Sequence, residues 1–163
     1  MYASIVPPLD HALGALSNIL SKAEAHVSAR GLKAPSLLGF RLFPDMLDFV
    51  KQVQLTCDFA ARAPARMAGD EPQSFPDEET SFADLQSRIS AVRAYIAHYS
   101  MDRFTGAAER EITIKMRGED VKMSGQAYLT MYALPQFYFH MTTAYNILRH
   151  NGVEIGKRDY MGA

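Results

Sequence analysis

The sequence lacks the features that mark several classes of protein. Its 163 residues include one cysteine, Cys57, so no disulfide can form within the chain. No run of apolar residues reaches the length of about 18 that a membrane span needs. The first twenty residues, MYASIVPPLDHALGALSNIL, have no basic start and are interrupted by prolines, an aspartate and a histidine. We therefore expect no membrane span and no signal peptide, and a reducing cytoplasm as the location.

An excess of charge of either sign is also missing. The chain has 17 basic and 18 acidic side chains, a net charge of −1, which is no reason to expect a nucleic acid or an anionic membrane as partner. Hydrophobic residues make up 48% and charged residues 21%, which is close to the average for globular proteins. A chain of this length buries roughly 70% of its unfolded surface, which is enough for one core. We predict a single domain, residues 1–163.

Four segments have apolar side chains at the three- and four-residue spacing of amphipathic helices. They are residues 5–29, 44–68, 80–100 and 135–151. Gly31 and Gly69 end the first two helices. Thr80 or Ser81 caps the third, and Pro135 suits the first turn of the fourth.

The spacing changes in EITIKMRGEDVKMSG, where apolar and polar residues alternate on both sides of RGED. This pattern predicts a β-hairpin over residues 111–124. We expect the next segment, GQAYLTMYAL, to be extended. The predicted fold class is therefore all-α, a four-helix bundle with a small β-hairpin inserted before the last helix.

Polar residues on two of the predicted helices point toward the interior. At about 100° per residue, Gln136 and Thr143 fall within roughly 60° of His140 on the last helix. On the second helix, Gln54 lies within the apolar face and Asp58 at its edge. We predict a polar interior pocket formed by Gln54, Asp58, Gln136, His140 and Thr143.

The apolar face of that second helix extends to its predicted start. It contains Phe43, Met46 and Leu47, followed by Val50, Val53, Cys57 and Ala60. We expect these side chains to be buried, with Cys57 as a small core residue.

The segments RLFPDMLDFVKQVQLTCDFA, FYFHMTTAYNILRHNG and GKRDYMG resemble an uncharacterised bacterial domain-of-unknown-function family within the DinB-like (YfiT-like) metalloenzyme superfamily. The last helix of that superfamily commonly reads HxxxHxGQxxxLLRxxG. The resemblance implies that His140 occupies the position of the second histidine and Gln136 that of the first. The third superfamily ligand is a histidine on the second helix, where this chain has none.

The resemblance implies a site for zinc or nickel in which one of three histidines remains. His140 and Asp58 are the candidate metal ligands, although glutamine at the other positions is a poor ligand for zinc. His140 is also the candidate catalytic residue. The alternatives are a metal-free pocket that binds a small molecule and a core histidine satisfied by Gln136, Gln54 or Asp58.

Two function classes therefore remain open. One is a non-catalytic protein that binds a small ligand in the pocket around His140. The other is a metal-dependent transferase or isomerase acting on small, thiol-linked substrates, as the resemblance implies. Aromatic residues crowded into 128–145 also extend to the outer side of the last helix. The hairpin, the C-terminal tail or a second copy in a homodimer could cover them, or the tyrosines could lie on the surface with their hydroxyls in water.

Overall fold

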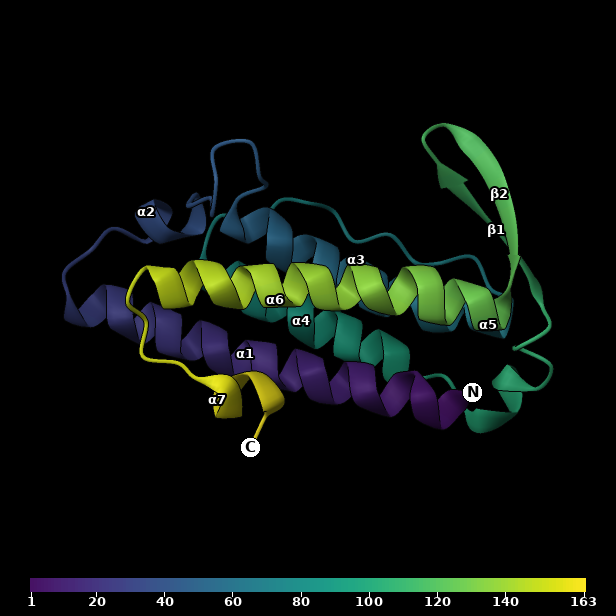
Figure 1. Cartoon of the computed structure of the whole chain (residues 1–163). Coiled ribbons are helices and arrows are strands. Elements are labelled where there is room, and N and C mark those ends of the chain that lie inside the picture. The colour runs from purple at the N-terminus through teal and green to yellow at the C-terminus, as the bar shows by residue number, and fades with distance from the viewer.

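Four long helices form the centre of the molecule, which we call the helical body (Figure 1). The computed structural model describes residues 1–163. The four helices are α1 (Val6–Ala29), α3 (Phe49–Ala68), α4 (Phe82–Ala97) and α6 (Leu134–His150). No helix combines the length and the apolar character needed to cross a membrane. The predicted class, mainly helical with one small hairpin, is confirmed.

Shorter elements connect or flank the long helices. They are η1 (Tyr2–Ser4), α2 (Ala34–Leu38), η2 (Met101–Phe104), α5 (Gly125–Ala127), η3 (Tyr128–Ala133) and α7 (Lys157–Met161). Of these, η3 is π-helical and η1 and η2 are 3₁₀ turns.

The second long helix begins five residues later than the sequence predicts. Asp48 is its N-cap, and the Asp48 side chain accepts a hydrogen bond of 3.0 Å from the Lys51 amide. The residues before Asp48 form a loop, so Phe43 and Leu47 are 63% and 42% exposed. The prediction that they lie on a buried face was therefore wrong. The helix ends as predicted, at Gly69, whose φ of 86° is left-handed.

The start of α4 agrees with the sequence prediction. The Ser81 hydroxyl accepts a hydrogen bond of 3.1 Å from the Asp84 amide, and the Asp84 carboxylate accepts one of 3.0 Å from the Thr80 amide. The two bonds satisfy amides that have no partner inside the helix. The helix ends at Ala97, three residues before the predicted end.

The hairpin is confirmed, with strands β1 (Glu111–Met116) and β2 (Glu119–Ser124) paired antiparallel. Its two-residue turn, Arg117 and Gly118, has φ values of 52° and 88°, as a type I′ turn requires. The hairpin projects from the end of the helical body at which α5 begins (Figure 1).

The expectation that residues 125–134 are extended was wrong. Residues 125–150 form one helical run, in which α5, the π-helical η3 and α6 follow each other without a break. Ser124 starts the run by accepting a hydrogen bond of 3.3 Å from the Ala127 amide. Tyr128 favours strands intrinsically, but here it is fully buried, and packing outweighs that propensity. Pro135 has no N–H to continue the α-helical bonding, and the wider π turn precedes it.

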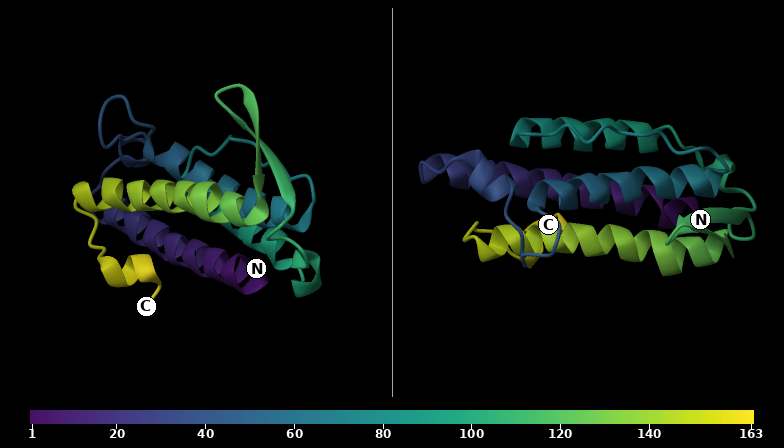
Figure 2. Two further views of the ribbon diagram at one scale, coloured as in Figure 1. Left: turned by 45° about the vertical axis from the view of Figure 1, so that its right-hand side comes forward. Right: turned by 90° about the horizontal axis from the view of Figure 1, so that it is seen from above.

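The four long helices are packed in layers. Seen from above (Figure 2, right), α4 and α6 lie on opposite sides, with α1 and α3 between them. Helix α3 packs extensively against both α6 and α4, whereas α1 packs mainly against α4. As a result, α3 is buried on two flanks, and each of its inward polar side chains faces either α4 or α6.

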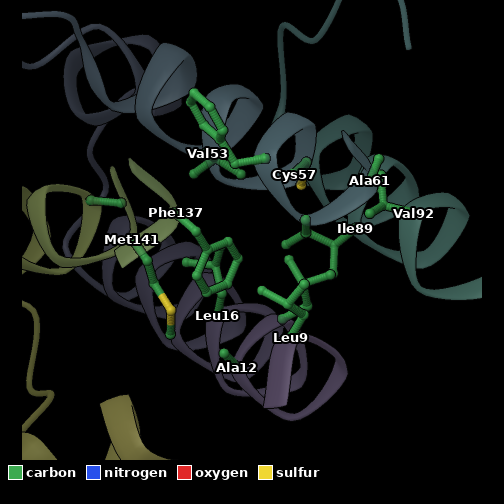
Figure 3. Packing of buried hydrophobic residues seen from close by; sticks show 14 of the residues in the cluster. Leu9, Ala12, Leu16, Val53, Cys57, Ala61, Ile89, Val92, Phe137 and Met141 are labelled. Carbon is green, nitrogen blue, oxygen red and sulfur yellow. The ribbon is translucent and has the colours of Figure 1, made fainter. Parts of the chain in front are cut away.

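The core lies where these helices meet, and Cys57 is part of it. Figure 3 shows Leu9, Leu16, Val53, Ile89 and Phe137 directed into this space from the four long helices. Cys57 is fully buried among them, as predicted. Burial raises the pKa of the Cys57 thiol to about 12, so the side chain behaves as a small apolar residue rather than a nucleophile.

The C-terminal tail spans α1 and α6, which contact each other only slightly. In α7, Asp159 accepts a bond of 2.5 Å from Lys22 of α1, and the Tyr160 hydroxyl lies 2.8 Å from that of Thr142 on α6. The Tyr160 ring also packs edge-on against Tyr145, with 5.7 Å between centroids. Of the three covers considered for the outer aromatic residues, the tail covers this part of α6.

Candidate functional site

His140 faces α3 from the middle of α6 and is 7% exposed, so its predicted inward position is confirmed. Its imidazole is nearly parallel to the Phe59 ring of α3, with 5.8 Å between centroids and 9° between planes. Phe139 meets the same imidazole edge-on at 5.2 Å. The aromatic neighbours shield most of the ring from water and fix its plane.

Gln52 of α3 is the hydrogen-bond partner of His140. The distance from His140 Nδ1 to Gln52 Oε1 is 2.8 Å, and Gln52 Nε2 donates a bond of 3.1 Å to the Leu47 carbonyl. Because the amide nitrogen of Gln52 is the donor to Leu47, its oxygen must be the acceptor from Nδ1. The protein therefore holds His140 in the tautomer that has its proton on Nδ1.

The other imidazole nitrogen, Nε2, is available at the surface. It makes no hydrogen bond within the protein, and Arg88 Nε is the single buried side-chain nitrogen or oxygen without a partner. Nε2 therefore retains some contact with solvent and has a lone pair without a protein partner. Burial lowers the pKa of His140 below its ordinary value of 6.5, so the imidazole is neutral at pH 7.

The predicted companions on α3, Gln54 and Asp58, bond to other groups. Gln54 Nε2 donates to Glu79 at 2.8 Å, and Asp58 pairs with Arg88 at 2.6 Å and with Arg62 at 2.7 Å. At about 100° per residue, Gln52 and Gln54 lie roughly 200° apart around the helix. Gln52 lies on the flank toward α6, whereas Gln54 and Asp58 lie on the flank toward α4. The structure does not bring them to His140.

Arg88 of α4 is the centre of a second polar cluster. Its side chain is 2% exposed and lies 2.6 Å from Asp58, 2.9 Å from Glu79 and 3.1 Å from Asp77. The guanidinium also donates 2.8 Å to the carbonyl of Pro76. These bonds attach the polar loop of residues 70–80 to the helical body, which gives the cluster a structural role.

Gln136 and Thr143 lie on the same side of α6 as His140 but do not bond to it. Gln136 lines a surface recess of about 390 Å³ whose other walls include Tyr132 and Phe139, the neighbour of His140. The Thr143 hydroxyl donates 2.7 Å to the Phe139 carbonyl, one turn back in the same helix. Only Gln136 of the two faces an open space.

The donor set around His140 does not fit the three-ligand metal site that the resemblance implies. No group of three or more His, Cys, Asp or Glu side chains lies close enough together to hold an ion. The α3 residue facing His140 is the neutral amide of Gln52, and Asp58, the other candidate ligand, is held by two arginines. A catalytic zinc needs three protein ligands, so we derive no reaction step through a metal here.

Sequence reasoning missed Gln52, although a signal was present. Gln52, Thr56 and Phe59 are spaced by four and three residues and so form one stripe of α3. All three are buried, and two of them contact His140. A polar residue on such a stripe needs a partner on the facing helix, and His140 is the one that is available.

Comparisons with known proteins identify the family of this chain. The family model described as "Domain of unknown function (DUF1993)" matches residues 1–161. A crystal structure of a DinB family member protein from Shewanella denitrificans is similar, with 38% sequence identity and a TM-score of 0.94. That match covers 99% of this chain and 92% of the other. No curated protein matches the sequence.

Proposed function

Since the chain belongs to the DUF1993 family of domains of unknown function and shares its fold with a DinB family member, we propose that it binds a small molecule at His140. The helical body is then a DinB-like four-helix bundle in which a metal-free polar site stands in place of three histidines. The observation that carries this proposal is the bond between His140 Nδ1 and Gln52 Oε1, which leaves Nε2 as an acceptor without a partner in the protein.

A histidine that only filled space would not need this support. Gln52 is 1% exposed, and both ends of its amide are used, one to hold His140 and one to hold the loop at Leu47. The result is a neutral imidazole with one tautomer, one ring plane and one unsatisfied nitrogen. Such a group is suited to accept a hydrogen bond from a ligand without rearranging.

The surroundings of His140 suggest the chemistry of the ligand. Phe139, whose ring meets the imidazole edge-on, lines a recess together with Tyr132 and Gln136. A flat, partly apolar molecule would pack against the rings, and an N–H or O–H group on it would donate to His140 Nε2. We therefore expect small aromatic donors, such as phenols, indoles and aromatic amides, to bind.

Nitrogen-15 NMR of histidine-labelled protein tests the proposal with a set of such compounds. We expect the Nε2 resonance of His140 to move on binding. His98 is the internal control, because its Nδ1 also lies near a carbonyl, that of Ala94 at 2.7 Å, but its ring is exposed and does not line the recess next to Phe139. Binding should be lost in His140→Phe and weakened in Gln52→Leu, with the fold checked by circular dichroism. Equal binding to His140→Phe, or no binding by any compound, would refute the proposal.

An enzyme is the second candidate, and the low pKa of His140 supports it. A neutral, oriented imidazole is suited to act as a general base near neutral pH. The resemblance extends this candidate to a metal-dependent transferase or isomerase acting on small, thiol-linked substrates. Calorimetric titration of untagged protein with Zn²⁺ and Ni²⁺ distinguishes the metal-dependent enzyme from the metal-free binding site. Stoichiometric binding that is lost in His140→Ala favours the metal enzyme, and no binding below the millimolar range favours the metal-free site.

The homodimer remains a prediction. Met131 and Phe139, which both line the recess beside His140, are 78% and 56% exposed. A second copy could cover them, and sedimentation equilibrium of the wild type and of Phe139→Ser would test this.

A further inference from the structure

A groove of about 480 Å³ lies between α3 and the hairpin, and its charges differ from those of the chain as a whole. Arg62 and Arg66, one turn apart on α3, line one side, and Lys115 of β1 lines the other. Asp120 is the single acidic residue of the lining. A chain with a net charge of −1 thus has one recess in which three cations face one carboxylate.

Arg66 is the residue that distinguishes this groove. Most arginines of the chain are either paired with a carboxylate or exposed. Arg66 and Arg110 are half-buried without such a partner, and Arg110 donates to the Met67 carbonyl. The Arg66 guanidinium makes one long bond, 3.4 Å to the Tyr128 hydroxyl, and lies 5.8 Å from the centre of the Tyr128 ring. Most of its five N–H donors therefore have no partner in the protein, although the side chain is half-buried.

The other two cations have weak or shared partners. Arg62 bonds to Asp58 at 2.7 Å, but Asp58 is also paired with Arg88 and lies outside the groove. Lys115 and Asp120 are 4.0 Å apart and are 80% and 64% exposed, so their attraction is screened by water. The Coulomb field of the groove is consequently positive.

The walls of the groove add an apolar surface to this field. Phe59 and Tyr132 meet edge-on there, with 5.9 Å between ring centroids, and the Thr113 hydroxyl stands beside them on β1. Guanidinium groups and aromatic rings in one groove suit a molecule that has an anionic group and a flat apolar part.

We propose that this groove binds a small organic anion, with its carboxylate or phosphate held by Arg66 and Arg62 and its apolar part packed against Phe59 and Tyr132. The arginines proposed to hold the anion do not bond to His140, so this proposal is separate from the ligand proposed there. The two sites are adjacent, because Phe59 stacks on the His140 imidazole and Tyr132 lines both recesses.

Titration with benzoate, phenyl phosphate and inorganic phosphate tests the proposal, with binding followed by NMR shifts of arginine Nε at constant ionic strength. We expect shifts at Arg66 with phenyl phosphate or with benzoate, whichever anionic group the site takes. Inorganic phosphate should bind more weakly, because it has no apolar part. We expect affinity to fall about tenfold or more in Arg66→Gln, the loss typical of a charge-assisted hydrogen bond.

The matched control is Arg149→Gln. Arg149 is exposed, has no carboxylate partner and is the penultimate residue of α6, whereas the hairpin precedes the other end of that helical run. Figure 1 shows α6 extending away from the hairpin. We expect Arg149→Gln to bind as the wild type does. Lys115→Gln changes an exposed strand residue that the fold does not need, and it should also weaken binding. Absence of shifts at Arg66, or an equal loss of affinity in Arg149→Gln, would overturn the proposal.

Discussion

Replacement of Arg88 by methionine should be among the most destabilising single changes in this chain. The side chain is 2% exposed and lies at the junction of α3, α4 and the loop of residues 70–80. Methionine has a similar length and no polar group, so it leaves Asp58 and Glu79 without their main cation. These carboxylates are 12% and 9% exposed, too little for water to replace the arginine fully.

The expected cost follows from that burial. Removing one partner of a buried ion pair costs about 3–5 kcal/mol, because the remaining charge is uncompensated. Asp58 keeps Arg62 and Glu79 keeps Gln54, which places the estimate toward the lower end of that range. At about 2–4 °C per kcal/mol for a domain of this size, a loss of about 3 kcal/mol should lower the melting temperature by about 6–12 °C.

The same helix supplies a matched control. Arg93 of α4 bonds to Asp10 of α1 at 2.7 Å, a pair that is equally short, but both side chains are 42% exposed. An exposed pair contributes about 0–1 kcal/mol, so Arg93→Met should change stability little. Urea unfolding followed by circular dichroism measures both variants.

Two results would refute this reasoning. One is an equal loss of stability in Arg88→Met and Arg93→Met, which would mean that burial does not determine the effect. The other concerns the double variant Arg88→Met with Asp58→Asn, in which one of the uncompensated charges is removed. The double variant should be more stable than Arg88→Met alone, and failure to recover any stability would show that the buried charge is not the cause.

Three further outcomes can be checked. Cys57 should not react with a thiol reagent such as dithionitrobenzoate until the protein is unfolded, because burial raises the pKa of its thiol to about 12. The pKa of His140 is lower in the folded chain than the ordinary 6.5, so the unfolded chain binds the proton more tightly. Stability should therefore be highest above pH 6.5 and decline as the pH falls below it, and urea midpoints of His140→Gln should decline less. In Gly125→Ala the new Cβ would lie 1.9 Å from the Ala107 carbonyl oxygen, so we expect a loss of about 1–3 kcal/mol in thermal melts, whereas Gly156→Ala, with open space around it, should melt like the wild type.

The parts of the fold that were predicted correctly depend on signals within a few residues. The hairpin turn needs left-handed backbone, and Gly118 supplies it next to strands of alternating polarity. The last helix stops at Asn151 because Gly152 has a φ of 83°. The predictions that failed required a choice between local signals. Pro44 and Asp48 are both acceptable helix starts, and only the packing of Phe49 selects the second.

The site was predicted in part for a similar reason. The helical spacing places His140 inward because only one side of α6 is exposed to solvent, and the structure confirms the inward position of His140. Helix α3 has neighbours on two flanks, so an apolar face drawn on the sequence does not say which flank meets α6. The sequence therefore indicated Gln54, which lies within the apolar face, whereas the positions of α4 and α6 make Gln52 the partner of His140.

The π-helical segment Tyr128–Ala133 has a consequence for how the hairpin is placed. A π turn accommodates one residue more than an α turn, so its presence rotates everything before it by about 100° relative to everything after it. The hairpin precedes this segment, and His140 follows it. Deletion of one residue within 128–133 would thus swing β1 and β2 around the axis of α6 while leaving His140 and Gln52 in place. The length of that short segment determines on which side of α3 the hairpin lies.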